Sequence, residues 1–411
     1  MLRMPVFLFA SFIFCPVTQL TSESDRQGPE QFSTDQLETI MFADTSDAQV
    51  YRTQCGQNWP HIFRFWEQQQ FRALDGDTSI KAIVWRCRGG CGGLGDRQRG
   101  ILTSFMLAMV TGRAFFVDSI FPTPLRHYFR VANPVLHWTF SDDLIFGRSC
   151  LEEEFTNGDP SIGDYAIANL SRYDEYDVVI QTNNYWQPFH VLRNPSLPKS
   201  MMPLRSYADH VLAGCILNYL LVPSSELQQQ VSRVRRLLAA NTQQLLAVQV
   251  RTGDHQAKNL TVIEALTRHF KSCVAAIQDS SSQKYRVFLT TDSEEVEHLL
   301  RAAYPDLVNF PGELYHVDGS FGAPQSFDAA FSKVVLDHLM VSQAHLLLIS
   351  RSGFAEYAAL RGFKPYYMPF HCEVNSPIEH YFFPTAQPIG AVGGEINSLD
   401  IYLSQIEALP T

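Results

Sequence analysis

Short apolar runs and amphipathic segments alternate along two stretches of the chain. In the first stretch, residues 81–85 (KAIVW) form a β-prone run, and residues 114–118 (AFFVD) form another. Between them lie a glycine-rich turn at 87–95 and residues 96–112, which carry apolar positions at helical spacing. An aspartate at the start of this segment and a glycine at its end can cap a helix. The pattern predicts one βαβ unit, in the order strand, glycine turn, helix, strand.

The second stretch repeats this alternation between residues 245 and 360. It predicts strands at 245–250, 285–291 and 345–349, and helices at 262–278, 294–303, 329–344 and 354–360. The intervening region is mixed, with a β-prone run at 177–181 and helices near 205–221 and 225–241. Two α/β stretches of this size predict two doubly wound lobes with a cleft between them.

These patterns divide the chain into five segments. Residues 1–20 are expected to form a signal peptide or short anchor. Residues 21–75 are expected to form a lead-in or stem, mobile in its polar and acidic first part. An N-terminal α/β lobe follows at 76–240, a C-terminal α/β lobe at 241–375, and a tail at 376–411. A length of 411 residues suits two domains of about 150–200 residues each.

Composition excludes several classes of protein. Apolar residues make up 45% and charged residues 18%, which excludes a disordered chain or a coiled coil as the main body. The formal net charge is −10, which argues against a non-specific nucleic-acid binder. No nucleic-acid partner is therefore expected.

The N-terminus indicates the secretory pathway. An apolar run from about Met4 to Val17 follows Arg3, and its length is short for a membrane span and typical of a signal peptide. A short signal anchor is the alternative, and we expect no other membrane contact. The sequence therefore predicts a protein of the ER or Golgi lumen, or a secreted protein.

Cysteine and histidine usage bears on the compartment and on metals. Of eight cysteines, one lies in the expected signal peptide, and the other seven are scattered without zinc-ligand spacing. Disulfides are expected in an oxidising lumen, with unassigned pairing and at least one thiol left over. The thirteen histidines form no H-x-x-x-H or H-E-x-x-H group, so no metal is expected.

The first candidate site is the glycine-rich turn at Gly90–Gly95. It satisfies G-x-G-x-x-G between a strand and a helix, where Gly93 and Gly95 would let the backbone approach a pyrophosphate at the helix N-terminus. Asp118 ends the next strand, as a ribose-binding acid would. The motif does not separate a nicotinamide cofactor from a sugar nucleotide, and a turn that only packs a helix on a sheet remains the alternative.

The second candidate site is Arg251, at the carboxyl end of a buried strand and followed closely by Asp254. A buried guanidinium is costly unless it pairs with an anion, and it can hold two phosphate oxygens at once. It could also neutralise a nucleoside-diphosphate leaving group. The alternative is an Arg251–Asp254 ion pair that braces the turn, and Asp254 could equally orient Arg251.

The third candidate site collects polar residues at other strand ends of the same lobe. In open α/β sheets, ligands lie beyond the carboxyl ends of the strands. Hydroxyl and N–H groups that open a helix suit a phosphate, and a carboxylate can accept from a base or ribose; helix capping is the alternative for each. The residues are Asp292, Asp337, Ser350, Ser352, Gly353 and Phe354.

Four short motifs resemble those of fucosyltransferases. Gly92–Asp96 (GGLGD), leading into the segment 111–118 (TGRAFFVD), resembles the first motif of the bacterial nodulation fucosyltransferase and its α1,6-fucosyltransferase relatives. Residues 250–254 (VRTGD) resemble the H-x-R-R-x-D motif of the α1,2-, α1,6- and protein O-fucosyltransferase superfamily. Thr291-Asp292 resembles the second motif, and the stretch 337–354 contains a likeness to the third.

The resemblance, which keeps the family's motif order over about 85–365, implies both a fold and an activity. The fold would be GT-B-like, with the N-terminal lobe on the acceptor side and the C-terminal lobe on the nucleotide-sugar side. The donor would be GDP-β-L-fucose, the sugar carbon would be inverted, and neither metal nor other cofactor would be needed. Arg251 would grip the diphosphate with help from Ser352 and Gly353, and Asp292 and Asp337 would sit near the nucleoside.

The sequence departs from the family pattern at three positions. Gln249 stands where histidine is usual, and Thr252 stands where a second arginine is common. The α1,6 relatives place a carboxylate base eight residues after the first arginine, where this chain has Asn259. The general base is therefore unassigned, with Asp254, His255 and Glu264, or a residue of the N-terminal lobe, as candidates.

The leading hypothesis is an inverting glycosyltransferase of the secretory pathway that transfers fucose to a hydroxyl of a glycan or glycoprotein acceptor. One alternative is a nicotinamide-dependent oxidoreductase, suggested by Gly90–Gly95 and Asp118. Another is a non-catalytic glycan-binding descendant of the family, suggested by Gln249, Thr252 and the missing base.

Overall fold

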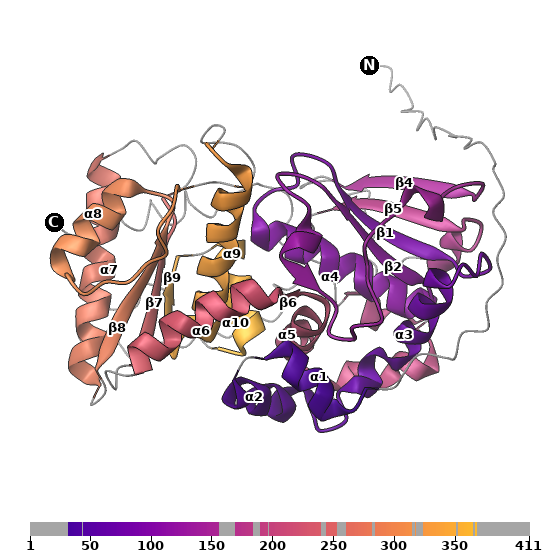
Figure 1. Ribbon diagram of the computed structural model, residues 1–411, viewed down its shortest axis with the longest axis horizontal. Coiled ribbons are helices and arrows are strands. Elements are labelled where there is room, and N and C mark those ends of the chain that lie inside the picture. The colour runs from indigo at the N-terminus through magenta and orange to yellow at the C-terminus, as the bar shows by residue number, and fades with distance from the viewer. Residues whose placement is uncertain are drawn as a thin grey trace, which may run out of the picture.

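The structure is a computed structural model, and it contains two α/β lobes (Figure 1). The described residues are 32–42, 44–155, 169–183, 190–195, 197–239, 244–252, 260–281, 284–314, 317, 324–350, 352–364 and 366–367. The expected signal peptide and the tail at 376–411 lie outside these residues. The predicted α/β fold class, with a parallel sheet in each lobe, is confirmed.

The N-terminal lobe is built on a four-stranded parallel sheet. The order is β2 (Ala114–Ser119), β1 (Ala82–Cys87), β5 (Val178–Asn183) and β4 (Cys150–Phe155). Every position of β2 is buried, because α-helices and loops cover both faces of a parallel sheet. All four carboxyl ends therefore meet at one edge of the sheet.

The crossover helix of the first βαβ unit is α4 (Leu94–Thr111), which is buried on nearly all sides. Gly112 ends it in the left-handed conformation, as predicted. The expected start differs, because Gly93 is the N-cap residue and Asp96 lies one turn inside the helix. The Asp96 carboxylate accepts a hydrogen bond from the Gly93 N–H at 3.1 Å, so it still satisfies the helix start.

The C-terminal lobe has a second four-stranded parallel sheet. Its order is β10 (Tyr366–Tyr367), β9 (Leu346–Ile349), β7 (Gln244–Val250) and β8 (Tyr285–Thr291). One apolar face packs against α7 (Leu260–Ser280) and α8 (Glu294–Ala303). The other face packs against α6 (Ser225–Ala239) and α9 (Phe327–Gln343). The alternating side chains of β7 fill both layers, as period-two geometry requires.

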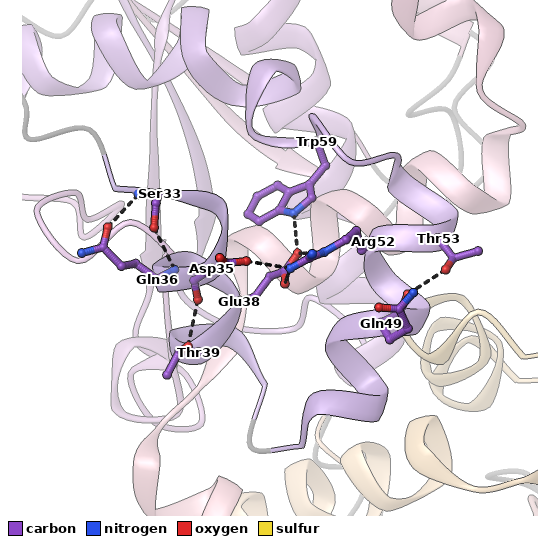
Figure 2. A network of polar contacts seen from close by, with 9 residues as sticks. All are labelled: Ser33, Asp35, Gln36, Glu38, Thr39, Gln49, Arg52, Thr53 and Trp59. Carbon is purple, nitrogen blue, oxygen red and sulfur yellow. Dashed lines mark hydrogen bonds and ion pairs between the residues drawn. The ribbon is translucent and has the colours of Figure 1, made fainter.

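Three helices precede the first sheet, which differs from the expected mobile lead-in. They are α1 (Thr34–Met41), α2 (Thr45–Cys55) and α3 (Pro60–Leu74). The buried Glu38 carboxylate of α1 accepts from Arg52 of α2, at 2.5 Å to Nη2, and from the indole N–H of Trp59 at 3.2 Å (Figure 2). This network ties α1 to α2 and to the start of α3, so the described part of the lead-in belongs to the folded body.

The middle of the chain connects the lobes. The predicted helix at 205–221 starts later, because a 3-10 segment at Lys199–Ser206 contains Pro203, and α5 (Asp209–Leu220) follows it. A short antiparallel pair is formed by β3 (Phe129–Arg130) and β6 (Val222–Pro223), and β6 lies between α5 and α6 in the chain. Further 3-10 turns occur at Leu125–His127, Asp142–Leu144, Leu170–Tyr173 and His190–Arg193.

The two lobes share one apolar core. The last helix, α10 (Gly353–Gly362), packs against α9 of its own lobe and also against α4 and α5 (Figure 1). A Cβ added to Gly95 of α4 would overlap the backbone of Gly353 and Phe354, because the two helix starts touch there. Buried residues therefore form a continuous cluster from α3 through α4, α5 and α10 to α9.

Two disulfides join described cysteines. Cys55 at the end of α2 pairs with Cys215 of α5, and Cys87 at the end of β1 pairs with Cys91. Cys273 is also disulfide-bonded, whereas Cys150 is a half-buried thiol outside the disulfides, with its Sγ 3.5 Å from the carbonyl of Arg148. The expected disulfides and the leftover thiol are therefore both present. No described helix combines the length and the apolar composition that crossing a bilayer requires.

Candidate functional site

A cavity of about 630 Å³ lies between the lobes, and we name it the inter-lobe cavity. Strands β7 and β8 end at it, α9 and the start of α10 flank it, and the start of α4 closes it from the N-terminal lobe. This is the position at which open α/β sheets bind ligands. Its lining residues are Gly93, Leu94, Gln249, Arg251, Thr290, Thr291, Asp292, Glu313, Leu314, Val317, Lys333, Val334, Asp337 and Phe354.

Arg251 follows the last residue of β7, is half-buried and lines the cavity. Its backbone N–H donates to the hydroxyl of Ser350 at 2.9 Å, and that hydroxyl donates to Oε1 of Gln249 at 2.8 Å. Ser350 is 4% exposed and follows β9. The ends of β7 and β9 are therefore fastened to each other through side chains. Ser350 positions the arginine and is not itself part of the cavity wall.

Thr252 binds Asp292 through two donors. Its backbone N–H lies 2.8 Å and its hydroxyl 3.0 Å from Oδ1 of Asp292, and Thr252 is only 4% exposed. The carboxylate that follows β8 is thus held against the residue after Arg251. Asp292 also lines the cavity.

Asp337 and Lys333 form a buried ion pair in the cavity wall. Lys333 Nζ lies 2.6 Å from Asp337 Oδ2, and the side chains are 7% and 5% exposed. Thr290 also approaches this oxygen, at 3.4 Å. Burial raises the pKa of Asp337 to about 6, although Lys333 and Thr290 act in the opposite direction. Among the described residues, none donates a hydrogen bond to Oδ1 of Asp337.

The glycine-rich turn contributes less to the cavity than its sequence predicted. Gly93 lines the cavity, but Gly95 is buried against the first residues of α10. Gly95 therefore lies in a close contact between two helices, which differs from the packing of a helix on a sheet that the motif left as the alternative. Gly353 is the other partner in this close approach.

Ser352 is the N-cap of α10, and its hydroxyl accepts from the N–H of Ala355 at 3.3 Å. The capping alternative thus holds for this side chain. Phe354 lines the cavity, and its carbonyl lies 3.1 Å from Nδ1 of His338. The start of α10 therefore borders the cavity, and His338 contacts the carbonyl of Phe354 in its first turn.

His338 links the two lobes behind the cavity. Its Nε2 lies 3.0 Å from Nε2 of Gln98 on α4, and the imidazole is fully buried. Burial lowers the pKa of His338 to about 3, so the ring is neutral. The amide can then donate to Nε2, and the Nδ1 proton can go to the Phe354 carbonyl.

The remaining predicted residues lie elsewhere. Asp254 and His255 fall outside the described residues, as does Asn259. Glu264 is on the exposed side of α7 and does not line the cavity. Asp118 is 6% exposed and pairs with both Arg86 and Arg88, at 2.8 Å each. Both arginines bind its Oδ2, and Asp118 does not line the inter-lobe cavity.

Two charged residues of the cavity were not singled out from the sequence: Glu313 and Lys333. The spacing of Lys333 and Asp337, four residues apart on one predicted helix, was the available signal for the ion pair. Glu313 lies in the irregular segment before α9, where periodicity gives no information.

A second pocket, of about 760 Å³, lies at the carboxyl ends of β1 and β2. We name it the N-lobe pocket. Phe140, Trp138 and the half-exposed Ile120 supply apolar surface, while Arg88 and Asp142 supply charge. Such a mixture of aromatic and charged groups suits a polar ring compound with one apolar face.

No group of three His, Cys, Asp or Glu side chains that could hold a metal ion occurs within the described ranges. The resemblance also implies that no metal is needed, and the described residues alone do not test that expectation.

No protein-family model and no curated protein matches this chain. Among solved structures, it resembles a point mutant of Arabidopsis thaliana FUT1 in complex with GDP, with a TM-score of 0.54 and 14% identity over 81% of this chain and 78% of that chain. Likenesses with lower scores are NodZ α-1,6-fucosyltransferase soaked with GDP-fucose (TM-score 0.46, 15% identity, 68% and 92% covered) and the apo form of POFUT1 (0.43, 12%, 70% and 97%). The first likeness shows that the chain has the fold of FUT1, which confirms the GT-B-like prediction.

Proposed function

We propose that the protein is a glycosyltransferase that transfers L-fucose from GDP-β-L-fucose to a hydroxyl of a glycan or protein. The observation that carries this proposal is the position of Arg251, which lines a cavity between two lobes at the carboxyl ends of parallel strands. The fold supports it, because the solved structure with the same fold contains GDP. The ordered motifs of the sequence agree with both.

The diphosphate belongs at Arg251. A guanidinium can bind two phosphate oxygens and remains charged at physiological pH. The nearby N-terminus of α10, at Gly353, adds the partial positive charge and the N–H groups of a helix start. Both would stabilise the negative charge that develops on GDP as it leaves.

The nucleoside belongs beside Asp337. A buried carboxylate oxygen without a donor is costly, and a ligand N–H that enters through the cavity would satisfy Oδ1. Asp292 stands at the adjacent strand end, where a ribose hydroxyl could reach it. The position of Gly93 allows the loop backbone to approach the ligand from the other lobe.

The reaction proposed is a single displacement with inversion. The acceptor oxygen attacks the anomeric carbon from the face opposite GDP, the carbon–oxygen bond to the β-phosphate breaks, and the acceptor proton passes to a base. Asp254 and His255, which follow Arg251, are the candidates for this base. The N-lobe pocket is the proposed place for the acceptor, because its apolar and charged walls suit a sugar ring.

We further propose that the protein works in the lumen of the ER or Golgi, or is secreted. The disulfides Cys55–Cys215 and Cys87–Cys91 support an oxidising compartment. The predicted signal sequence supports the same route.

A donor screen tests the proposal. The purified protein is incubated with GDP-, UDP- and CMP-sugars and mixed glycan acceptors, and the released nucleotide is measured. We expect GDP release from GDP-fucose that depends on acceptor. Arg251→Ala should reduce it at least a hundredfold, since hydrogen bonds to charged groups contribute about 1.5–3 kcal/mol each. Arg268→Ala, on the exposed side of α7, is the matched control and should leave turnover unchanged. Glycan binding without any GDP formation would favour the non-catalytic descendant instead.

A further inference from the structure

Another pocket, of about 670 Å³, lies where α1 and α2 meet α6, α9 and α10, and we name it the joint pocket. Residues of these helices and of α5 line it, and it shares no lining residue with the inter-lobe cavity. The charged residues of its lining are Asp47, Arg361 and Lys364. Neither the sequence motifs nor the proposed function assigns a role to these three side chains.

Arg361, in the last turn of α10, is a buried cation. It is 6% exposed, and burial lowers its pKa to about 10, so the guanidinium is still charged at neutral pH. Nη2 donates to the carbonyl of Leu221 at 2.8 Å, and the guanidinium carbon lies 6.0 Å from the centre of the Phe129 ring. These groups and the C-terminal end of α10 carry only partial negative charge. Among the described residues, none accepts a hydrogen bond from Nη1.

Lys364 is the second cation of the pocket lining. It is half-buried, burial lowers its pKa although the charge of Asp47 acts in the opposite direction, and no described residue forms a hydrogen bond or ion pair with its ammonium. The Asp47 carboxylate is itself engaged by Arg235 of α6, which also lies 3.4 Å from Asp44. The described part of the chain thus leaves two positive charges at the joint pocket without a negative partner. Because a buried charge is costly unless it is paired, this arrangement points to a bound anion.

We propose that the joint pocket binds a phosphate or sulfate group, held by Nη1 of Arg361 and by the ammonium of Lys364. A tetrahedral dianion matches two cations in charge, and its oxygens suit hydrogen bonds from a guanidinium. A carboxylate carries one charge and would balance only one of the cations. A volume of about 670 Å³ gives room for such a group. This inference does not rest on the proposed function, because the joint pocket and the inter-lobe cavity are lined by different residues.

The test follows thermal unfolding in sodium phosphate, sulfate, acetate and chloride at equal ionic strength. An ion that binds a site of the folded protein raises the unfolding temperature along a binding curve, whereas exclusion of salt from the protein surface acts without a binding midpoint. We expect phosphate and sulfate to stabilise the protein with such a midpoint, and acetate to behave like chloride. Arg251→Ala, which removes the proposed diphosphate-binding arginine from the inter-lobe cavity, should keep this stabilisation.

Variants locate the bound ion. In Lys364→Met, the phosphate concentration at the midpoint should rise roughly tenfold or more, the contribution of one hydrogen bond to a charged group. In chloride, this variant should unfold at or above the wild-type temperature, because it lacks an ammonium that was half-buried without a partner. Arg361→Met should abolish the stabilisation by phosphate. Lys284→Met, at an exposed lysine outside the joint pocket, is the matched control and should respond as the wild type does.

Several results would overturn the inference. Equal unfolding temperatures of the wild type in phosphate and chloride would show that no such ion binds, and equal stabilisation by acetate would exclude a preference for dianions. Loss of the effect in Arg251→Ala would place the ion in the inter-lobe cavity instead. A Lys364→Met variant that unfolds at a lower temperature in every salt, with an unchanged phosphate midpoint, would show a structural role only. Because the wild-type response and Lys364→Met suffice, poor folding of Arg361→Met would not prevent a decision.

Discussion

Thr252 stands where the family pattern has a second arginine, and the structure gives it a different task. Its N–H and its hydroxyl both bind Oδ1 of Asp292, and almost none of its surface reaches solvent. A small side chain with one hydroxyl fits this position, and a long cationic side chain has no room. The loss of the arginine is therefore coupled to the way the strand ends of β7 and β8 are joined.

We expect that Thr252→Arg fails to restore the family pattern. The larger side chain must displace Asp292 or leave the buried position, so the free energy of unfolding should fall by about 2–3 kcal/mol. Denaturant unfolding measures this loss, and GDP affinity should fall with it. Thr252→Ser keeps the hydroxyl and should stay within about 1 kcal/mol of the wild type. A stable arginine variant with tighter GDP binding would contradict this account.

The sequence could place a residue at the cavity where a general rule of sheet geometry applied to it. Arg251 and Asp292 were found because polar residues at the carboxyl ends of parallel strands gather at one edge. The role of Gly95 was not predictable, since a glycine that admits a pyrophosphate and one that admits another backbone look identical in sequence. The pairing of Lys333 with Asp337 depends on which face of α9 meets the cavity, which spacing alone does not fix.

At the scale of elements, helices and strands whose ends carry capping or turn residues were predicted well. Strand β8 and helix α8 have the predicted bounds, because the strand ends at Thr291 and Ser293, two residues later, caps the helix. The helices α1 and α2 were missed because their stability comes from contacts distant in sequence. Tyr51 of α2, for example, is fully buried and donates to the carbonyl of Cys215.

The contact between the starts of α4 and α10 provides a prediction at this scale. A methyl group at position 95 would overlap the Gly353 backbone, so Gly95→Ala must move one helix relative to the other. We expect a loss of at least about 2 kcal/mol in the free energy of unfolding, and weaker GDP binding because the first turn of α10 shifts. The control is Gly89→Ala, in the same loop but with no atom within 4 Å of the added methyl group. Equal stability of the two variants would show that the helix starts are not in contact.

At the scale of the whole molecule, the sequence predicted two lobes and a cleft but not how the lobes are joined. The lobes are joined where α10 packs against α4 and α5, and these contacts span more than a hundred residues of sequence. Periodicity shows that a helix has an apolar face, but not which sheet or helix that face will meet. The disulfide Cys55–Cys215 joins the described lead-in helices to α5 of the same core.

The two disulfides should differ in their effect on global stability. Cys55 and Cys215 are separated by 160 residues and Cys87 and Cys91 by 4, so the first restricts the unfolded chain far more. Chain-entropy arguments give about 5 kcal/mol for the long loop and about 2 kcal/mol for the short one. Thermal unfolding should therefore show a larger loss for the Cys55→Ala/Cys215→Ala pair than for Cys87→Ala/Cys91→Ala. The reverse order would mean that strain or packing at the short loop dominates.

The packing of α10 against α4 and α5 limits how a nucleotide would enter and leave the inter-lobe cavity. Swinging the lobes apart would pull α10 away from α4 and α5, breaking the Gly95–Gly353 contact and wetting a large apolar surface. Such a separation of the lobes is therefore too costly to accompany each round of nucleotide binding. A nucleotide would instead enter and leave through the opening of the inter-lobe cavity, with the two lobes held in place.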